Sequence, residues 1–224
     1  WCMRNNLWNL ANRGLILYAP DGSFIESPGY WNYATNYLTG MMFALESALG
    51  DDFGYYEMWG LEKTFYFAAQ TEFPVYNTKT NSSNYIFWNY HDSSYGGAQS
   101  TDVFFLASQI LNDDGLAKIR LDQLNGKKGK SYSWYDVIAY KPEYKDLDIT
   151  NLNLERDYLM TGIDAAVGRS AWEDGCLFVG IMGNENNITD HGQVDSGNFI
   201  YANKNYNWFV DLGADQYNVY TYFG

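Results

Sequence analysis

The sequence has few cysteines, few basic residues and no long apolar run. Its two cysteines, Cys2 and Cys176, lie far apart and match no metal-ligand spacing. Lysine and arginine total 14 against 27 aspartates and glutamates, which gives a net charge of -13. Nucleic acids and anionic membranes both favour a basic surface, so we expect neither as a partner. No segment resembles a signal peptide or a membrane span.

Cys176 opens an apolar run, CLFV, which favours a buried small hydrophobic residue. A disulfide between Cys2 and Cys176 is the alternative interpretation. The chain begins with Trp1 rather than methionine, and residues 2–11 already read as the body of a helix. We therefore expect a piece of a longer protein.

The composition is that of a folded protein rich in aromatic residues. Hydrophobic residues make up 46% of the 224 residues and charged residues 18%, which is enough apolar material for a sizeable core. Aromatic residues account for 19%, and 21 of them are tyrosines. Tyrosine and tryptophan combine an apolar face with a polar edge and can stack on sugar rings, although most aromatics fill a core.

Hydrophobic periodicity predicts helices first and strands afterwards. Helical spacing appears over residues 2–11, 35–49, 55–70, 103–111 and 116–124, with Gly50 as a stop and Ser100 or Thr101 as a cap. Short runs rich in Val, Ile, Phe and Trp follow at 165–172, 175–182, 198–202 and 208–212. This order predicts an α+β protein whose antiparallel sheet follows the helices.

Three polar segments could carry chemistry. Residues 21–33 (DGSFIESPGYWNY) form a loop that leads into a helix, and loops of this kind are more often on the surface than in the core. Residues 87–97 (FWNYHDSSYGG) hold His91 beside Asp92, between two tyrosines. Residues 190–199 (DHGQVDSGNF) hold His191 close to Asp195. The first could equally be a turn with aromatic anchors, and the His–Asp of the second a hydrogen-bonded pair. The third could be half of a metal site or half of a catalytic pair.

Four segments, in this order, resemble the heparinase II/III-like polysaccharide lyase family. They are residues 21–33, 168–172 (GRSAW), 190–199 and 208–213 (WFVDLG), which match DGS-x-x-E-x-x-x-Y, R-S-x-W, H-x-H-x-D-x-G-x-F and W-x-x-D-x-G. The resemblance implies an (α/α) toroid followed by antiparallel β-sheet. It also implies cleavage of a uronic-acid-containing polysaccharide by β-elimination, and a secreted, periplasmic or cell-surface location.

The resemblance also implies roles for individual residues. Asn32 would neutralise the uronate carboxylate. Tyr90, or failing that Tyr95, would move protons. His191 would complete the site from the side of the sheet. Residues around them would bind substrate, namely Glu26, Tyr30, Trp31, Tyr33, His91 and Arg169, although Arg169 could equally form a structural ion pair.

No cofactor is required by this chemistry, but the family holds a structural zinc. Asp211 matches a metal-ligand aspartate, whereas Gln193 stands where the second histidine of H-x-H is expected. Glutamine is a poor zinc ligand, so the resemblance implies weak or absent zinc here.

Length limits what this chain can contain. Roughly 150 residues of helix are too few for a closed toroid at ordinary helix and loop lengths. We therefore expect residues 1–140 to be part of a toroid, 141–162 to connect, and 163–224 to begin a β-sandwich.

Two other functions remain open at this point. Toroids also host glycoside hydrolases, for which Glu26 with Asp92 or Asp195 would supply paired carboxylates. A non-catalytic glycan-binding module is the third interpretation, favoured by Gln193 and the acidic composition. The lyase accounts for the histidine, asparagine and tyrosines in the motifs, and no motif singles out a carboxylate pair.

Overall fold

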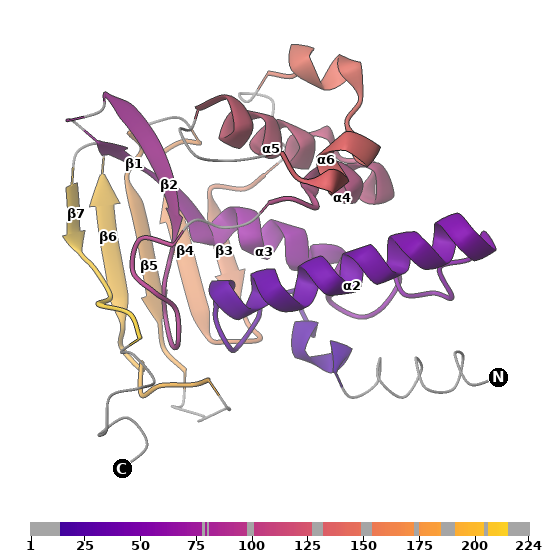
Figure 1. Cartoon of the computed structure of the whole chain (residues 1–224). Helices are drawn as coiled ribbons and strands as arrows, with labels where there is room; N and C mark the ends of the chain where they lie inside the picture. Colours follow the sequence, from indigo (N-terminus) through magenta and orange to yellow (C-terminus); the bar gives the residue numbers. More distant parts are fainter. Residues whose placement is uncertain are drawn as a thin grey trace.

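The computed structural model describes residues 14–77, 79, 81–97, 101–126, 132–148, 154–172, 175–184, 191–203 and 206–214. The helices lie together on one side of the described structure, and a five-stranded antiparallel sheet lies on the other (Figure 1). The chain is an α+β protein, as the sequence predicted. None of the described helices combines the length and apolar character needed to span a membrane.

Helix α2 (Pro28–Leu49) forms because both of its ends are well capped. The Ser27 side chain accepts a hydrogen bond from the Tyr30 backbone N–H at 3.4 Å, and Pro28 occupies the first turn. At the other end Gly50 takes a left-handed conformation with φ of 69°. The helix predicted over 35–49 and its glycine stop are confirmed, and its start lies earlier than the periodicity indicated.

The remaining helices are short. They are α3 (Thr64–Thr71), α4 (Phe104–Leu111), α5 (Asp114–Gly126), α6 (Trp134–Ala139) and the 3-10 turns Leu15–Tyr18, Leu61–Lys63 and Pro142–Asp146. Helices α4 and α5 confirm two predictions, but the side chain of Thr101 does not cap α4; its backbone carbonyl accepts from Phe104 N at 2.9 Å. The helix expected over 2–11 and the alternative cap Ser100 lie outside the described residues.

The helix expected over 55–70 begins only at Thr64, because local side chains hold the preceding residues in turns. Asp51 accepts a hydrogen bond from the backbone N–H of Phe53 at 2.7 Å. Asp52 accepts from the backbone N–H groups of Gly54 and Tyr56 at 3.2 and 3.1 Å. Aspartate favours such turns over helix because its short side chain competes for backbone donors.

The five-stranded sheet runs in chain order. Its strands are β3 (Asp157–Met160), β4 (Ala165–Arg169), β5 (Phe178–Met182), β6 (Phe199–Asn203) and β7 (Tyr206–Phe209). Strands β4 to β7 confirm the predicted antiparallel runs. Strand β3 falls in the segment 141–162 that was expected only to connect the two layers.

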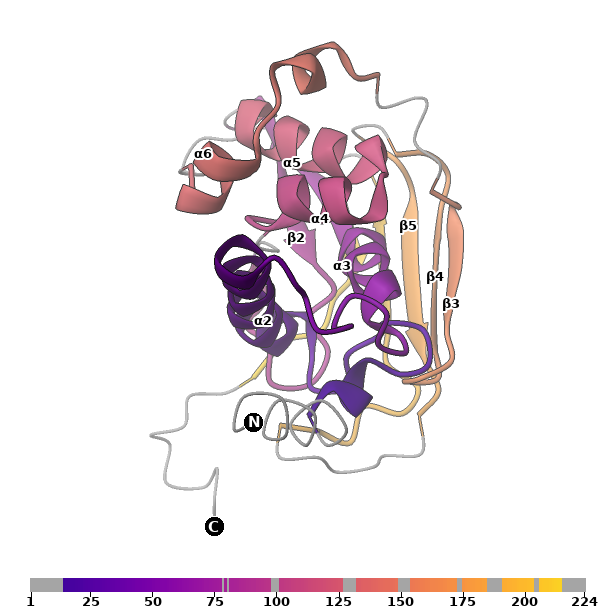
Figure 2. The same ribbon diagram turned by 90° about the vertical axis from the view of Figure 1, so that its right-hand side faces the viewer.

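A hairpin of β1 (Glu72–Asn77) and β2 (Ser82–Phe87) interrupts the helical part of the chain. The sequence did not predict this hairpin, since residues 1–140 were expected to be helical. Tertiary contacts hold the hairpin in place: the ring of Phe73 stacks on that of Phe178 in β5, with centroids 4.5 Å apart. Figure 2 shows β2 between α2 and the layer formed by β3 to β5.

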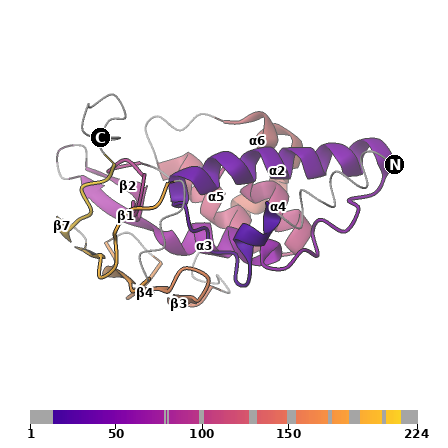
Figure 3. The ribbon, with the colours of Figure 1, turned by 90° about the horizontal axis from the view of Figure 1, so that it is seen from below.

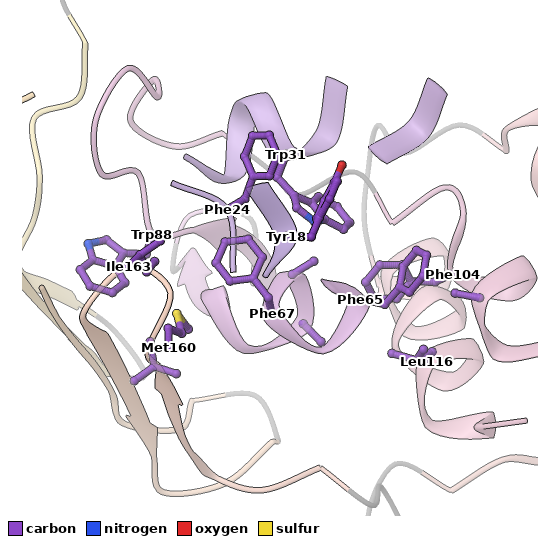
Figure 4. Packing of buried hydrophobic residues seen from close by; sticks show 14 of the residues in the cluster. Tyr18, Phe24, Trp31, Phe65, Phe67, Trp88, Phe104, Leu116, Met160 and Ile163 are labelled. Carbon is purple, nitrogen blue, oxygen red and sulfur yellow. The ribbon is translucent and has the colours of Figure 1, made fainter. Parts of the chain in front are cut away.

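One hydrophobic core joins the helices to the inner face of the sheet. Phe24, Trp31 and Phe67 meet in its centre, and Met160 and Trp88 extend it towards the strands (Figure 4). Cys176 also lies buried, as its apolar surroundings predicted; its proposed partner Cys2 is outside the described residues. The shared core brings the loops at the helix–sheet junction close together.

Candidate functional site

The loop before α2 is fastened to the sheet through Asp21. Its carboxylate accepts hydrogen bonds from Ser23 and, across the junction, from Thr161 Oγ1 at 2.8 Å and Gly162 N at 3.2 Å. Burial would raise the pKa of this carboxyl, but these hydrogen bonds outweigh it and lower the pKa below 3.8. Tyr158 of β3 also donates to the Asp21 carbonyl at 3.1 Å. The DGS motif therefore has a structural role in joining the two layers.

Residues at the start of α2 divide between core and surface. Trp31 is completely buried, and its Nε1 donates to Thr64 Oγ1 at 2.7 Å, so it offers no surface to a sugar. This corrects its assignment to substrate binding. Tyr30, Asn32 and Glu26 are half-buried, and Tyr33 is 69% exposed. Tyr30, Asn32 and Tyr33 lie in the first turns of α2, and Glu26 lies in the loop before it.

Tyr90 lies in the core as well. Its side chain is fully buried, and its hydroxyl donates to the Phe24 carbonyl at 2.7 Å. Burial raises its pKa well above 10, so the phenol stays protonated and cannot serve as a base in this conformation. Tyr95 differs: it is 51% exposed, and its hydroxyl oxygen accepts from Asn207 Nδ2 at 3.2 Å.

The two histidines pair with aspartates in a crossed arrangement. His91 Nδ1 lies 3.2 Å from Asp195 Oδ2, and His191 Nδ1 lies 3.3 Å from Asp92 Oδ2. Each histidine therefore contacts the aspartate from the other segment and not its sequence neighbour. The backbone N–H of Asp92 also donates to the His191 carbonyl at 3.3 Å. Residues 87–97 and 191–199 thus form a single site.

His91 has a structural position within this site. It is 1% exposed, and its φ of 52° is unusual for a residue with a side chain. The Asp195 carboxylate accepts the backbone N–H of His91 at 2.7 Å, and Gln193 N lies 3.1 Å from His91 Nδ1. These contacts hold the strained turn, so His91 orients the segment and is too buried to touch a large substrate.

His191, by contrast, faces outward. Its side chain is 31% exposed, and the ring of Tyr30 stacks on it with centroids 3.7 Å apart and an interplanar angle of 19°. Asp92 contacts Nδ1, and among the described residues no hydrogen bond involves Nε2. Gln193 Nε2 donates to the other Asp92 oxygen at 2.9 Å. An aspartate that fixes one imidazole nitrogen leaves the other poised to exchange a proton.

The donors around Asp211 do not fit zinc. One Asp211 carboxylate oxygen is hydrogen-bonded to Asn198 Nδ2, and the other accepts from Gly213 N at 2.6 Å. The Gln193 amide is turned towards Asp92, and Asn89 Nδ2 binds the Asp211 backbone carbonyl at 3.1 Å. Within the part of the chain that the structure describes, no three His, Cys, Asp or Glu side chains are grouped to hold a metal. Burial raises the pKa of Asp211 above 3.8.

Arg169 is a structural residue far inside the molecule. It is 6% exposed, and its Nη2 donates to the carbonyls of Gln70 and Glu72 at 2.5 and 3.0 Å. Its guanidinium lies over the Trp172 ring, 3.9 Å from the centroid. Burial lowers its pKa from 12.5 to about 10. These contacts fasten β4 to β1, so the RSAW motif supports the fold and Arg169 does not reach a bound polymer in this conformation.

Sequence reasoning found the segments but missed the role of Asp92. It considered Asp92 only as a neighbour of His91 or as a hydrolytic carboxylate, whereas the structure places it against His191. The only local signal was that both aspartates stand near histidines. Comparison with known protein families and with curated proteins finds no match for this chain.

Proposed function

We propose that this chain is part of a polysaccharide lyase that cleaves a uronic-acid-containing polymer by β-elimination. The observation that carries the proposal is the junction itself, where Asp92, His191 and Tyr30 converge from three separate segments. An oriented, half-exposed imidazole beside an aromatic face suits proton abstraction from a sugar ring. The family resemblance of the four motifs adds to this support.

In the proposed reaction, His191 Nε2 takes the proton from C5 of the uronate. The electron pair forms the C4–C5 double bond as the C4–O4 bond breaks. The family resemblance assigns stabilisation of the sugar carboxylate to Asn32, which lies two residues after Tyr30 on α2 and therefore on a different face of the helix from the ring stacked on His191. Tyr95 then protonates O4. Its hydroxyl oxygen accepts a hydrogen bond from Asn207 Nδ2, so the hydroxyl proton can be donated to the leaving oxygen.

Tyr30 and Tyr33 would bind the sugars on either side of the cleaved bond, and Glu26 would lie at the edge of the site. The helices α2 to α6 would belong to an (α/α) toroid over 1–140, and the sheet would begin a sandwich over 163–224. A secreted, periplasmic or cell-surface location would follow from the family resemblance. The chemistry uses no metal or cofactor.

Glycoside hydrolysis is supported less well. It requires a carboxylic acid with a raised pKa to protonate the leaving group. Hydrogen bonds from His91 hold the pKa of Asp195 below 3.8 even though burial opposes them. Asp92 is bonded to His191 and Gln193 and is nearly buried. Asp195 therefore does not present the acid that hydrolysis needs, and the Asp92 carboxylate is already engaged by two partners.

The test is ultraviolet absorbance during incubation with heparan sulfate, chondroitin sulfate, hyaluronan and alginate. Elimination creates a conjugated 4,5-unsaturated uronate, whereas hydrolysis creates none. We expect absorbance to rise with one of the polymers and to stay flat for His191→Ala. Binding without any rise, in the wild type and in the variant alike, would instead identify a non-catalytic glycan-binding module.

A further inference from the structure

Exposed aromatic side chains continue from His191 along one face of α2. Tyr30, Tyr33 and Tyr37 follow at intervals of three and four residues, which places them on the same side of a helix. Tyr33 and Tyr37 are 69% and 70% exposed, and their ring centroids are 5.1 Å apart in an edge-to-face arrangement. Seven residues of helix separate Tyr30 from Tyr37 by about 10 Å.

Helix α6 extends this row. The Tyr135 hydroxyl donates to the Asn36 carbonyl at 2.9 Å, and the same hydroxyl occupies the space beside Gly40, where a Cβ would lie only 2.1 Å from it. Trp134 packs on Tyr135 with ring centroids 3.7 Å apart and remains 56% exposed. Figures 2 and 3 both show α6 alongside α2. A glycine at position 40 is needed for this close approach.

We infer that the aromatic strip, made of Tyr30, Tyr33, Tyr37, Tyr135 and Trp134, is a binding surface for several consecutive sugar residues of a glycan chain. The inference rests on the proposed function, because the strip begins at the ring that stacks on His191. A polymer whose uronate lies at His191 would extend along α2 towards α6.

The chemistry of the strip favours a glycan over other ligands. Its members are tyrosines and a tryptophan, which offer flat apolar faces to C–H groups and polar edges to hydroxyls. A contiguous row of exposed rings is typical of a binding surface, whereas single exposed apolar side chains are common. Because the aromatic strip is continuous with the proposed proton-transfer site, the same polymer is the expected ligand. A protein partner is the competing occupant.

Affinity electrophoresis tests the inference without requiring catalysis. His191→Ala protein would be run in native gels that contain heparan sulfate, chondroitin sulfate, hyaluronan or alginate, so that the polymer stays intact. We expect retardation by at least one polymer, with Tyr37→Ala and Trp134→Ala each weakening the apparent affinity roughly 5- to 10-fold. Tyr37→Phe should keep its affinity, because the ring is retained.

Exposed aromatics outside the strip provide matched controls. Trp59→Ala and Tyr206→Ala remove residues that are 65% and 60% exposed, and both should retain the full retardation. If the Tyr37→Ala and Trp134→Ala variants are retarded as much as the His191→Ala parent, the aromatic strip does not bind the polymer. The absence of retardation by any polymer would lead to the same conclusion. Retardation that depends on the strip, combined with no ultraviolet product from the wild type, would refute the lyase and leave the strip standing.

Discussion

His191 Nδ1 lies 3.3 Å from Asp92 Oδ2, although 99 positions separate the two residues in the chain. The contact is made across the junction between the segment that follows β2 and the segment that precedes β6. It gives the exposed histidine a fixed orientation and a negatively charged neighbour. Catalytic use of His191 would therefore depend on Asp92 as a positioning residue.

Asp92→Asn should lower kcat for elimination by about 100-fold or more, with little change in KM, because the amide no longer stabilises a protonated imidazole. The measurement is the initial rate of unsaturated-uronate formation across pH. Asp114→Asn, a change at an exposed helix start, provides the control and should leave both constants unchanged. An unaltered pH profile for Asp92→Asn would argue against the dyad.

Tyr90→Phe should lower the free energy of unfolding by about 1–2 kcal/mol, because the buried Phe24 carbonyl loses its hydrogen-bond donor. Urea titration followed by tryptophan fluorescence would measure the change. The elimination rate of the folded variant should remain close to that of the wild type. A loss of several hundredfold in rate would show that the Tyr90 hydroxyl leaves Phe24 and acts on the substrate.

Arg169→Lys should destabilise the fold by about 2 kcal/mol, since one ammonium cannot reproduce two hydrogen bonds and the stacking on Trp172. Thermal unfolding monitored by circular dichroism would detect it. The KM for polymer should not change at a temperature where the variant is folded. A raised KM with unchanged stability would restore the original assignment of Arg169 to substrate binding.

Asp195 should contribute stability that depends on pH. Burial opposes ionisation, but hydrogen bonds from His91 outweigh it and hold the folded-state pKa below 3.8. A depressed carboxyl pKa stabilises the fold above about pH 4, and this stability is lost as pH falls through the lowered value. Asp195→Asn should therefore lower the urea midpoint at pH 7, and its difference from the wild type should shrink towards pH 3. A difference that stays constant between these pH values would show that the pKa of Asp195 is not lowered in the folded state.

Several local features were predictable from the sequence because neighbouring residues decide them. Periodicity and Gly50 located the end of α2, since helix capping depends on a few adjacent positions. Short runs rich in Val, Ile, Phe and Trp, bounded by turn residues, located β4 to β7, because such side chains suit a pleated sheet. The segments that hold His91 and His191 could be found in the same way, from their polar residues beside turns.

Other features needed the tertiary structure. Hairpin β1–β2 escaped prediction because its packing partner, Phe178, is far away in the chain. Trp31, Tyr90 and Arg169 looked available for a ligand, yet all three are buried by contacts with distant segments. Burial of a side chain depends on the residues that pack against it, and these cannot be identified from the neighbouring sequence.

The sequence by itself determined the α+β class, the antiparallel strands that follow the helices, and the segments in which polar residues gather. Only the tertiary structure decided that His91 pairs with Asp195 and His191 with Asp92, and not each with its neighbour. The physical reason is that the shared core fixes the separation of the two layers. Side chains at the junction then pair by their position in space and not by their distance along the chain.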